Sequence, residues 1–388
     1  MFLLFNSNYL LSLQKDDINL IAQYFKKFLM EIDVKNCSGP GLKNLITDVT
    51  GVQVGHSENL EVGTGVTVVT SHKPFSAAVD VRGGGPGTRE TDMLSLENSI
   101  GRADAIVLSG GSAYGLDACA EIQDLLRQDQ KGYKLGNAII PLVPGAVIFD
   151  LNINENPHVN EVGKRSPWRV LAKKAYNSLS KQLQQGSYGA GCGATTATLK
   201  GGQGSSSWKQ KLSDGKEYTV GALVINNAVG NPLLNEGPHF LSGFLEYKNE
   251  FGGFGASLES SDHIIRAKRV PSSLGQSNTF NNIASNTVIG IVATDAPVTR
   301  ANLKRMAIMA HDGIAKSVSP AHTPMDGDTI FAISTNDVSN KEILQNTDIL
   351  ALGARASDCL ARACNRAVFE ANIIGKSKPA WKNLFKGK

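Results

Sequence analysis

Glycine is the residue type that most constrains what this chain can fold into, because its glycines gather in short runs and form no regular repeat. The 388 residues include 40 glycines, and one of the densest runs reads RGGGPGTRE at 82–90. Glycine has no Cβ, so it permits tight turns and lets one stretch of backbone pack directly on another. The run at 82–90 fits neither the dinucleotide-binding spacing nor a P-loop. It therefore favours tight packing over phosphate binding.

The composition is that of an ordinary globular protein. Hydrophobic residues make up 41% and charged residues 19% of the chain, with a formal net charge of +4. These values exclude disordered, collagen-like and membrane-spanning classes. A net charge of +4 is also too small to indicate a nucleic-acid-binding surface. We expect neither a membrane nor a nucleic acid as a partner.

The cysteines and the first residues indicate the compartment. There are five cysteines, an odd number, and no CxxC pair. Their thiols are expected to be reduced, as in a cytoplasmic protein. The apolar start MFLLFNSNYLLSL lacks a basic region and a small-residue cleavage site, so it does not read as a signal peptide.

Hydrophobic spacing predicts a layered α/β body. Residues 16–32 have the period of an amphipathic helix, and we assign residues 1–40 to an accessory extension. Residues 41–376 are predicted to form one catalytic domain. Alternating strand and helix patterns favour the α/β class. The predicted strands cover parts of 45–80, 102–109, 138–151, 287–293 and 329–334, and the predicted helices cover 116–126, 168–183, 297–318 and 341–370.

Two common kinds of catalytic site find little support. The segment LSGGSAYG at 108–115 places a serine at a strand-to-helix turn, but the following glycine is three residues away, not two as in a nucleophile elbow. The seven histidines are scattered, and neither HExxH nor CxxC occurs. We expect no metal and no cofactor.

The most informative feature is a junction between a polar segment and a buried strand. Residues 256–286 are rich in Ser and Asn without an apolar period, and the strand TVIGIVA begins at Thr287. A cut between Asn286 and Thr287 would give Thr287 a free α-amine beside its own hydroxyl. An α-amine with a pKa of about 7.7–8.0 can act as a base near neutral pH. From this feature alone, an ordinary loop-to-strand boundary would be the preferred interpretation.

Two carboxylates strengthen the catalytic interpretation. Asp326 and Asp328 lie in PMDGDT, just before the predicted strand at 329–334. That strand and the one beginning at Thr287 flank a single helix, which makes them neighbours in a sheet. One carboxylate could then orient the threonine amine, while the other binds a cationic substrate end or tunes the first. Turn chemistry is the alternative role for both residues.

Nine segments in chain order resemble the DmpA-type peptidase family, which includes β-peptidyl aminopeptidases, the L-aminopeptidase/D-amidase type and the nylon-oligomer endohydrolases. The resemblance covers residues from about 45 to about 370, and the threonine and DGD pattern is most similar to the nylon-oligomer (6-aminohexanoate oligomer) branch. The matching segments include ITDVTGVQVGH, RGGGPGTRETDML, IVLSGGSAYGLDA, GAGCGATTATLKGG, TVGALVINNAVGN, NTVIGIVATDA and AHDGIAKSVSPAHTPMDGDTIFA.

The resemblance implies a fold and a set of site residues. The fold is a layered αββα sandwich of the DmpA and ornithine acetyltransferase type, similar to the N-terminal-nucleophile hydrolases. The implied precursor cuts itself into an α chain ending at Asn286 and a β chain starting at Thr287, and the processed αβ units form homo-oligomers. Asn227 takes the place of the family's oxyanion donor, Lys200 that of its lysine, and Asp326 and Asp328 those of its acidic pair. The turn VPGAVIFD lacks the tyrosine of the aminopeptidase branch.

The predicted function is therefore that of a self-processing amidohydrolase or aminopeptidase. Thr287 would attack a linear amide or peptide carbonyl, Asn227 would stabilise the oxyanion, and water would release the acyl group. Asn227 could instead make turn hydrogen bonds, and Lys200 could be solvated. The alternatives for the whole protein are an acyltransferase of the ornithine acetyltransferase type and an unprocessed, non-catalytic binding protein.

Overall fold

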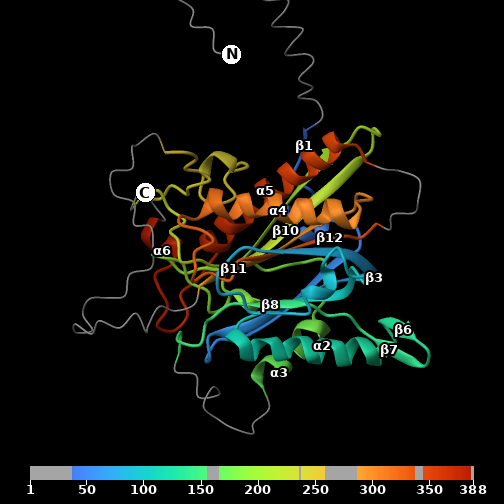
Figure 1. Cartoon of the computed structure of the whole chain (residues 1–388). Helices are drawn as coiled ribbons and strands as arrows, with labels where there is room; N and C mark the ends of the chain where they lie inside the picture. The colour runs from blue at the N-terminus through green and yellow to red at the C-terminus, as the bar shows by residue number, and fades with distance from the viewer. Residues whose placement is uncertain (1–36, 155–165, 236, 258–285, 337–343, 386–388) are drawn as a thin grey trace, which may run out of the picture. The chain divides into compact units, whose positions relative to one another are not determined.

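The computed structural model describes residues 37–154, 166–235, 237–257, 286–336 and 344–385 (Figure 1). Residues 39–388 cluster as one compact unit, and the description below concerns this unit. The predicted helix at 16–32 lies outside the described residues, as do most of the polar segment at 256–286 and nearly all of the accessory extension.

The secondary structure consists of short and long strands with five described α-helices. The strands are β1 (Cys37–Gly39), β2 (Val52–Asn59), β3 (Thr64–Val81), β4 (Thr88–Arg89), β5 (Arg102–Ser109), β6 (Tyr133–Leu135), β7 (Ala138–Ile140), β8 (Gly145–Val147), β9 (Gly202–Lys211), β10 (Glu217–Asn227), β11 (Thr287–Thr294) and β12 (Thr329–Ser334). The helices are α2 (Asp117–Gln128), α3 (Pro167–Asn177), α4 (Arg300–Ser317), α5 (Asn346–Phe369) and α6 (Trp381–Phe385).

The strands form two layers between two layers of helices, which confirms the predicted αββα sandwich (Figure 1). Hydrogen-bonded strands follow the order β9-β10-β11-β12-β3-β5-β8-β4, and β2 pairs with β3. Helices α4 and α5 cover the layer of β9 to β12, and α2 and α3 cover the layer of β2, β3 and β5. The neighbours β11 and β12 are parallel, as the helix between them predicted.

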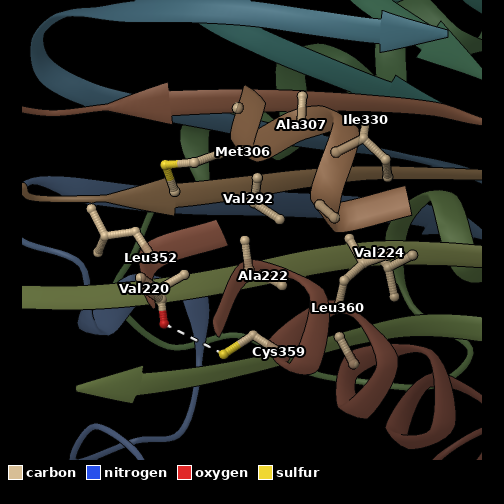
Figure 2. Close-up of a cluster of buried hydrophobic side chains, with 14 of the residues drawn as sticks. Val220, Ala222, Val224, Val292, Met306, Ala307, Ile330, Leu352, Cys359 and Leu360 are labelled. Atoms are coloured by element: carbon tan, nitrogen blue, oxygen red, sulfur yellow. Dashed lines mark hydrogen bonds between the residues drawn. The ribbon is translucent and has the colours of Figure 1, made fainter. Parts of the chain in front are cut away.

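Alternating side chains divide the interior into separate cores. On β11, Ile289 and Ile291 face the other sheet, whereas Val288 and Val292 face the helices. Successive residues of a strand point to opposite faces, so a strand buried on both sides is apolar at nearly every position. Figure 2 shows the core beneath α4 and α5, where Val292 lies among Met306, Leu352 and residues of β10.

Strand β3 joins the two sheet layers. Its 18 residues pair with β5 and β2 through their first part and with β12 through residues 76–81. The register with β5 shifts between Thr70 and Phe75. Because β3 pairs with β2 and β5 on one side of this shift and with β12 beyond it, one strand connects the two sheet layers.

Close backbone contacts confirm the expectation drawn from the glycines. A Cβ built on Gly204 of β9 would lie 2.0 Å from the carbonyl oxygen of Ala363 in α5, and one on Gly202 would lie 2.4 Å from that of Ala367. Helix α5 therefore packs directly on the backbone of β9. Residues of β9 were not predicted as a strand, because its sequence GQGSSSWKQK has no apolar alternation.

Two predicted elements have different bounds from those expected. The strand expected over 138–151 is two short strands, β7 and β8, because Pro141 and Pro144 lack the N–H that a continuous ladder requires. The helix expected over 168–183 ends at Asn177. There the chain turns to pair with β2, and Ser180 exchanges backbone hydrogen bonds with Val54 at 2.9 and 3.0 Å.

Candidate active site

The predicted site residues come from strand ends that meet at one edge of the sheet. Thr287 opens β11, and its partner across the antiparallel pair is Asn227, the last residue of β10. Strand β12 lies on the other side of β11, so the PMDGDT loop just before it reaches the same edge. Strand β3 runs antiparallel to β12, which brings the RGGGPG loop there as well.

Thr287 and the peptide bond before it are buried and closely hydrogen-bonded. The hydroxyl of Thr287 donates to the carbonyl oxygen of Asn286 at 2.5 Å. The backbone N–H of Gly327 is directed at both groups, 3.1 Å from the Thr287 hydroxyl oxygen and 3.0 Å from the Asn286 carbonyl oxygen. A hydroxyl, a carbonyl and a backbone donor thus meet at the junction that the sequence singled out.

The carboxylate of Asp328 links its own loop to the strand of Thr287. One oxygen, Oδ1, accepts the backbone N–H of Val288 at 2.7 Å. The other, Oδ2, accepts the backbone N–H of His322 at 3.0 Å and lies 2.7 Å from its ring Nδ1. Asp328 is 1% exposed, so these hydrogen bonds lie in a region of low dielectric and hold the carboxylate firmly.

Asp326 has a matching arrangement on the other side of Gly327. Its Oδ2 accepts the backbone N–H of Thr323 at 2.9 Å and the Thr323 hydroxyl at 2.6 Å. Its Oδ1 accepts the backbone N–H of Val229, just beyond the end of β10, at 3.4 Å. Burial, with a further contribution from the charge of Asp328, raises the pKa of Asp326. The two carboxylates therefore fix the loop that presents the Gly327 N–H.

The RGGGPG loop packs against the back of this carboxylate loop. A Cβ built on Gly83 would lie 2.2 Å from the carbonyl oxygen of Asp326, and one on Gly84 would lie 2.7 Å from the Cα of Pro324. The backbone N–H groups of Arg82 and Gly85 donate to the carbonyls of Asp328 and Asp326 at 2.9 and 2.8 Å. This glycine run serves close backbone packing, as the sequence indicated.

Asn227 lies beside Thr287 and is buried. Its side-chain oxygen accepts the backbone N–H of Thr195 at 2.9 Å, and its amide nitrogen donates to the carbonyl of Phe149 at 3.4 Å. The bond to Phe149 is long, so the amide can turn toward a better acceptor at little cost.

Lys200 is fully buried, where solvation had been the alternative. Its Nζ donates to the carbonyls of Gly191, Ala194 and Gly201 at 3.2, 2.6 and 3.1 Å. Burial lowers its pKa to about 8, and the charge of Asp150 acts in the opposite direction. Lys200 lies just before β9, which pairs with β10. Its Nζ bonds to Ala194, and the next residue, Thr195, bonds to the side chain of Asn227, so Lys200 and Asn227 contact the same loop.

Sequence reasoning missed several residues of this region. His322 is one of the scattered histidines of the sequence, yet it contacts Asp328 directly. Gly327 contributes its backbone N–H, which no side-chain motif reveals. Asp150 is buried beside Lys200, its Oδ1 accepts the N–H of Gly111 at 2.8 Å, and burial raises its pKa to about 7. The order of PAHTPMDGDT could have indicated His322, since it precedes the carboxylates in the same short loop.

Within the described ranges, no group of three or more His, Cys, Asp or Glu side chains could hold a metal ion. None of the helices placed in the structure is both long and apolar enough to cross a membrane.

Solved structures of known peptidases share this fold. An L-aminopeptidase D-Ala-esterase/amidase from Ochrobactrum anthropi, described as a variant of the Ntn hydrolase fold, superposes with a TM-score of 0.66 at 21% identity, covering 87% of this chain and 89% of that one. A β-aminopeptidase from a Burkholderia species gives a TM-score of 0.63 at 20% identity, covering 88% and 92%. At this identity the likeness defines the fold.

The chain belongs to peptidase family S58, whose pattern matches residues 44–379. It is 37% identical over 360 residues to an uncharacterized aminopeptidase of Mycobacterium tuberculosis, covering 89% of this chain and 98% of the relative. It is 28% identical over 350 residues to the 6-aminohexanoate-oligomer endohydrolase of Paenarthrobacter ureafaciens, covering 84% and 87%. The family predicted from the motifs is confirmed. The protein is a hydrolase of peptide or linear amide bonds, and neither the acyltransferase nor the binding protein is favoured.

Proposed function

We propose that this protein is a precursor that cuts its own chain between Asn286 and Thr287 and then uses Thr287 as an N-terminal nucleophile. The observation that carries the proposal is the contact between the Thr287 hydroxyl and the Asn286 carbonyl oxygen. The backbone N–H of Gly327 is directed at both of these groups. A hydroxyl held against the adjacent carbonyl reacts within the same molecule, which removes the entropic cost of bringing the two groups together.

The self-cleavage proceeds in two steps. The Thr287 oxygen attacks the carbonyl carbon of Asn286 and the C–N bond breaks. The hydroxyl proton passes to the departing nitrogen, which becomes the new α-amine, and an ester remains on Thr287. Water then hydrolyses this ester and releases the carboxylate of Asn286. The Gly327 N–H, 3.0 Å from the carbonyl oxygen, stabilises the negative charge that develops there.

Substrate hydrolysis repeats the same chemistry between molecules. The α-amine of Thr287 accepts the hydroxyl proton and the oxygen attacks an amide carbonyl. The C–N bond of the substrate breaks, the departing amine takes that proton, and water later hydrolyses the ester and releases the acyl group as an acid. The side-chain nitrogen of Asn227 can donate to the oxyanion, because its bond to the Phe149 carbonyl is long at 3.4 Å, while the side-chain oxygen stays bonded to the Thr195 N–H. Lys200 adds positive charge near this edge, which disfavours protonation of the α-amine.

Linear amides and short peptides are the proposed substrates. The names of the relatives, an aminopeptidase and an endohydrolase of 6-aminohexanoate oligomers, support this class. We also propose a cytoplasmic location, because the four described cysteines, Cys119, Cys192, Cys359 and Cys364, are free and buried. Homo-oligomers of processed αβ units are proposed from the family resemblance.

A comparison of two threonine variants tests the proposal. The purified wild-type protein should give two polypeptides, with Thr287 at the new N-terminus by sequencing and mass. Thr287→Ala should stay one full-length chain. Thr294→Ala is the matched control, since Thr294 lies at the other end of β11 and is also buried. Cleavage of the Thr287→Ala chain at the same bond would exclude the threonine mechanism.

The hydrolysis itself needs a separate assay. The processed protein should be presented with amides that carry a free amino terminus, a capped terminus or a long methylene spacer. Turnover of free-amine substrates alone defines an aminopeptidase, and turnover of capped ones defines an endohydrolase. Addition of a competing amine distinguishes hydrolysis from acyl transfer, because an acyltransferase would form the new amide.

A further inference from the structure

His322 and Asp328 form a close side-chain pair at the candidate site. Both the backbone N–H and the ring Nδ1 of His322 are directed at the same oxygen, Oδ2 of Asp328, at 3.0 and 2.7 Å. The other oxygen accepts the N–H of Val288, the residue after the nucleophile. We propose that His322 is a positioning residue for self-cleavage, and that its Nδ1–H fixes the Asp328 carboxylate and, through Val288, the hydroxyl of Thr287.

The hydrogen-bond partners define the state of the imidazole. A carboxylate can only accept, so Nδ1 must carry a proton whether the ring is neutral or charged. Nδ1 is therefore not free to take a proton from Thr287. This assigns Nδ1 of His322 to orientation of the Asp328 carboxylate.

The second ring at this place supports the same assignment. His311 packs edge-on against His322 with the ring centroids 4.9 Å apart, and its Nε2 lies 3.0 Å from the carbonyl oxygen of Asp80. Burial lowers the pKa of His311 to about 4, so its ring is uncharged at neutral pH and contacts His322 as a neutral group. Asp80 itself is paired with Lys304 and Arg82. The imidazole of His322 is thus held between a fixed ring and a fixed carboxylate.

The backbone of His322 suggests the variants that separate its contributions. Its φ is 56°, in the left-handed region, where asparagine is tolerated and glycine is unstrained. Asparagine also places an amide nitrogen where Nδ1 of histidine lies. His322→Asn therefore keeps both the backbone shape and the donor, whereas His322→Gly keeps only the shape and His322→Ala keeps neither.

The experiment follows self-cleavage of each full-length chain after a short pulse of cell-free synthesis with labelled methionine. Loss of a hydrogen bond to a charged group should slow cleavage about 10- to 100-fold in His322→Gly and His322→Ala, and His322→Asn should stay within about threefold of the wild type. His72→Ala is the matched control, because His72 is exposed on β3. Circular dichroism and the thermal midpoint identify any variant that fails to fold. If His322→Ala fails to fold, the comparison of His322→Asn with His322→Gly still tests the role of the hydrogen bond.

Several outcomes would overturn the inference. Wild-type rates for both the Asn and the Gly variant would mean that the hydrogen bond from the ring has no role. Equal slowing of all three would mean that the imidazole is needed for another purpose. The inference rests on the proposed function, and Thr287→Ala separates the two. If Thr287→Ala is cut, the proposed function fails; if it stays whole while His322→Ala cleaves at the wild-type rate, only the role of His322 fails.

Discussion

The carboxylate of Asp328 accepts the backbone N–H of Val288 at 2.7 Å, one residue past the candidate nucleophile. This bond ties β11 to the loop before β12 across a parallel strand pair. The loop also presents the Gly327 N–H to Thr287, so the position of the nucleophile and that of its backbone donor depend on the same short segment.

The two carboxylates should differ when each is replaced by asparagine. An asparagine at 326 can direct its oxygen to the two Thr323 donors and lose only the 3.4 Å contact with Val229. An asparagine at 328 must place its NH2 group against either Val288 or His322, both donors at 2.7 Å. We expect Asp328→Asn to slow processing by at least about 100-fold and Asp326→Asn to slow it less, with small shifts in thermal midpoint. A large loss of stability with normal activity per folded molecule would favour a turn role.

Gly327 should be intolerant of even a methyl group. A Cβ there would lie 2.9 Å from the Thr287 hydroxyl oxygen and 2.8 Å from the carbonyl of Gly85. Gly327→Ala should therefore displace the nucleophile and stop self-cleavage, as seen by gel and mass. Gly85→Ala is the matched control, since its Cβ would meet nothing closer than 3.8 Å. Wild-type cleavage of Gly327→Ala would remove the backbone donor from the mechanism.

The α-amine of Thr287 should act as the base of the processed enzyme. Activity is then expected to rise with pH through the titration of the amine, at or below its ordinary value of about 7.7–8.0. Selective acetylation of this amine should abolish turnover although the hydroxyl is untouched. Full activity after confirmed acetylation would point instead to a histidine base.

Lys200 should make folding stability depend on pH in the alkaline range. Its pKa falls from 10.5 to about 8 in the folded protein because it is buried. Between these values the unfolded chain binds more protons at this residue, so the free energy of unfolding rises with pH, by about 3 kcal/mol over the window. The Lys200→Met variant lacks this rise.

Denaturant titrations at pH 8 and pH 10.5 measure the difference, with Thr287→Ala as the uncut parent and Lys200→Met added to it. The free energy of unfolding of the Lys200→Met chain, minus that of this parent, should fall by about 3 kcal/mol between pH 8 and pH 10.5. A difference that does not change with pH would mean that Lys200 titrates normally in the folded state.

Gly204 should be required for the packing of α5 on β9. A methyl group there would lie 2.0 Å from the carbonyl oxygen of Ala363. Gly204→Ala is expected to lower the free energy of unfolding by at least about 1–3 kcal/mol, measured by denaturant titration. Gly237→Ala, whose Cβ would meet nothing closer than 3.9 Å, should change it little, and equal effects would contradict the packing argument.

Sequence patterns predicted those strands and helices whose apolar spacing matches the faces that they bury in the fold. The strand beginning at Thr287 is apolar at nearly every position because both faces are buried, and so it was found. Strand β9 was missed because its serines face polar partners; Ser205, for example, donates to the carbonyl of Ala222 at 2.7 Å. Such long-range hydrogen bonds leave no periodic signal in the sequence.

The candidate site was predictable to the extent that side chains define it. Thr287, Asn227 and the two aspartates meet at one edge because β10, β11 and β12 are neighbours, and chain order with one intervening helix was enough to suggest the parallel pair. The Gly327 N–H is a backbone group, and the role of His322 depends on a turn with φ of 56°. Neither can be inferred from residue type alone.

The order of the strands has a consequence for how the processed molecule would refold. Strands β11 and β12 lie after the proposed cut, yet they are paired between β10 and β3, which lie before it. The uncut chain folds in a first-order reaction, whereas two separate polypeptides must first meet. Self-cleavage would thus change the molecularity of folding: refolding of the cut protein would depend on its concentration, and that of the Thr287→Ala chain would not.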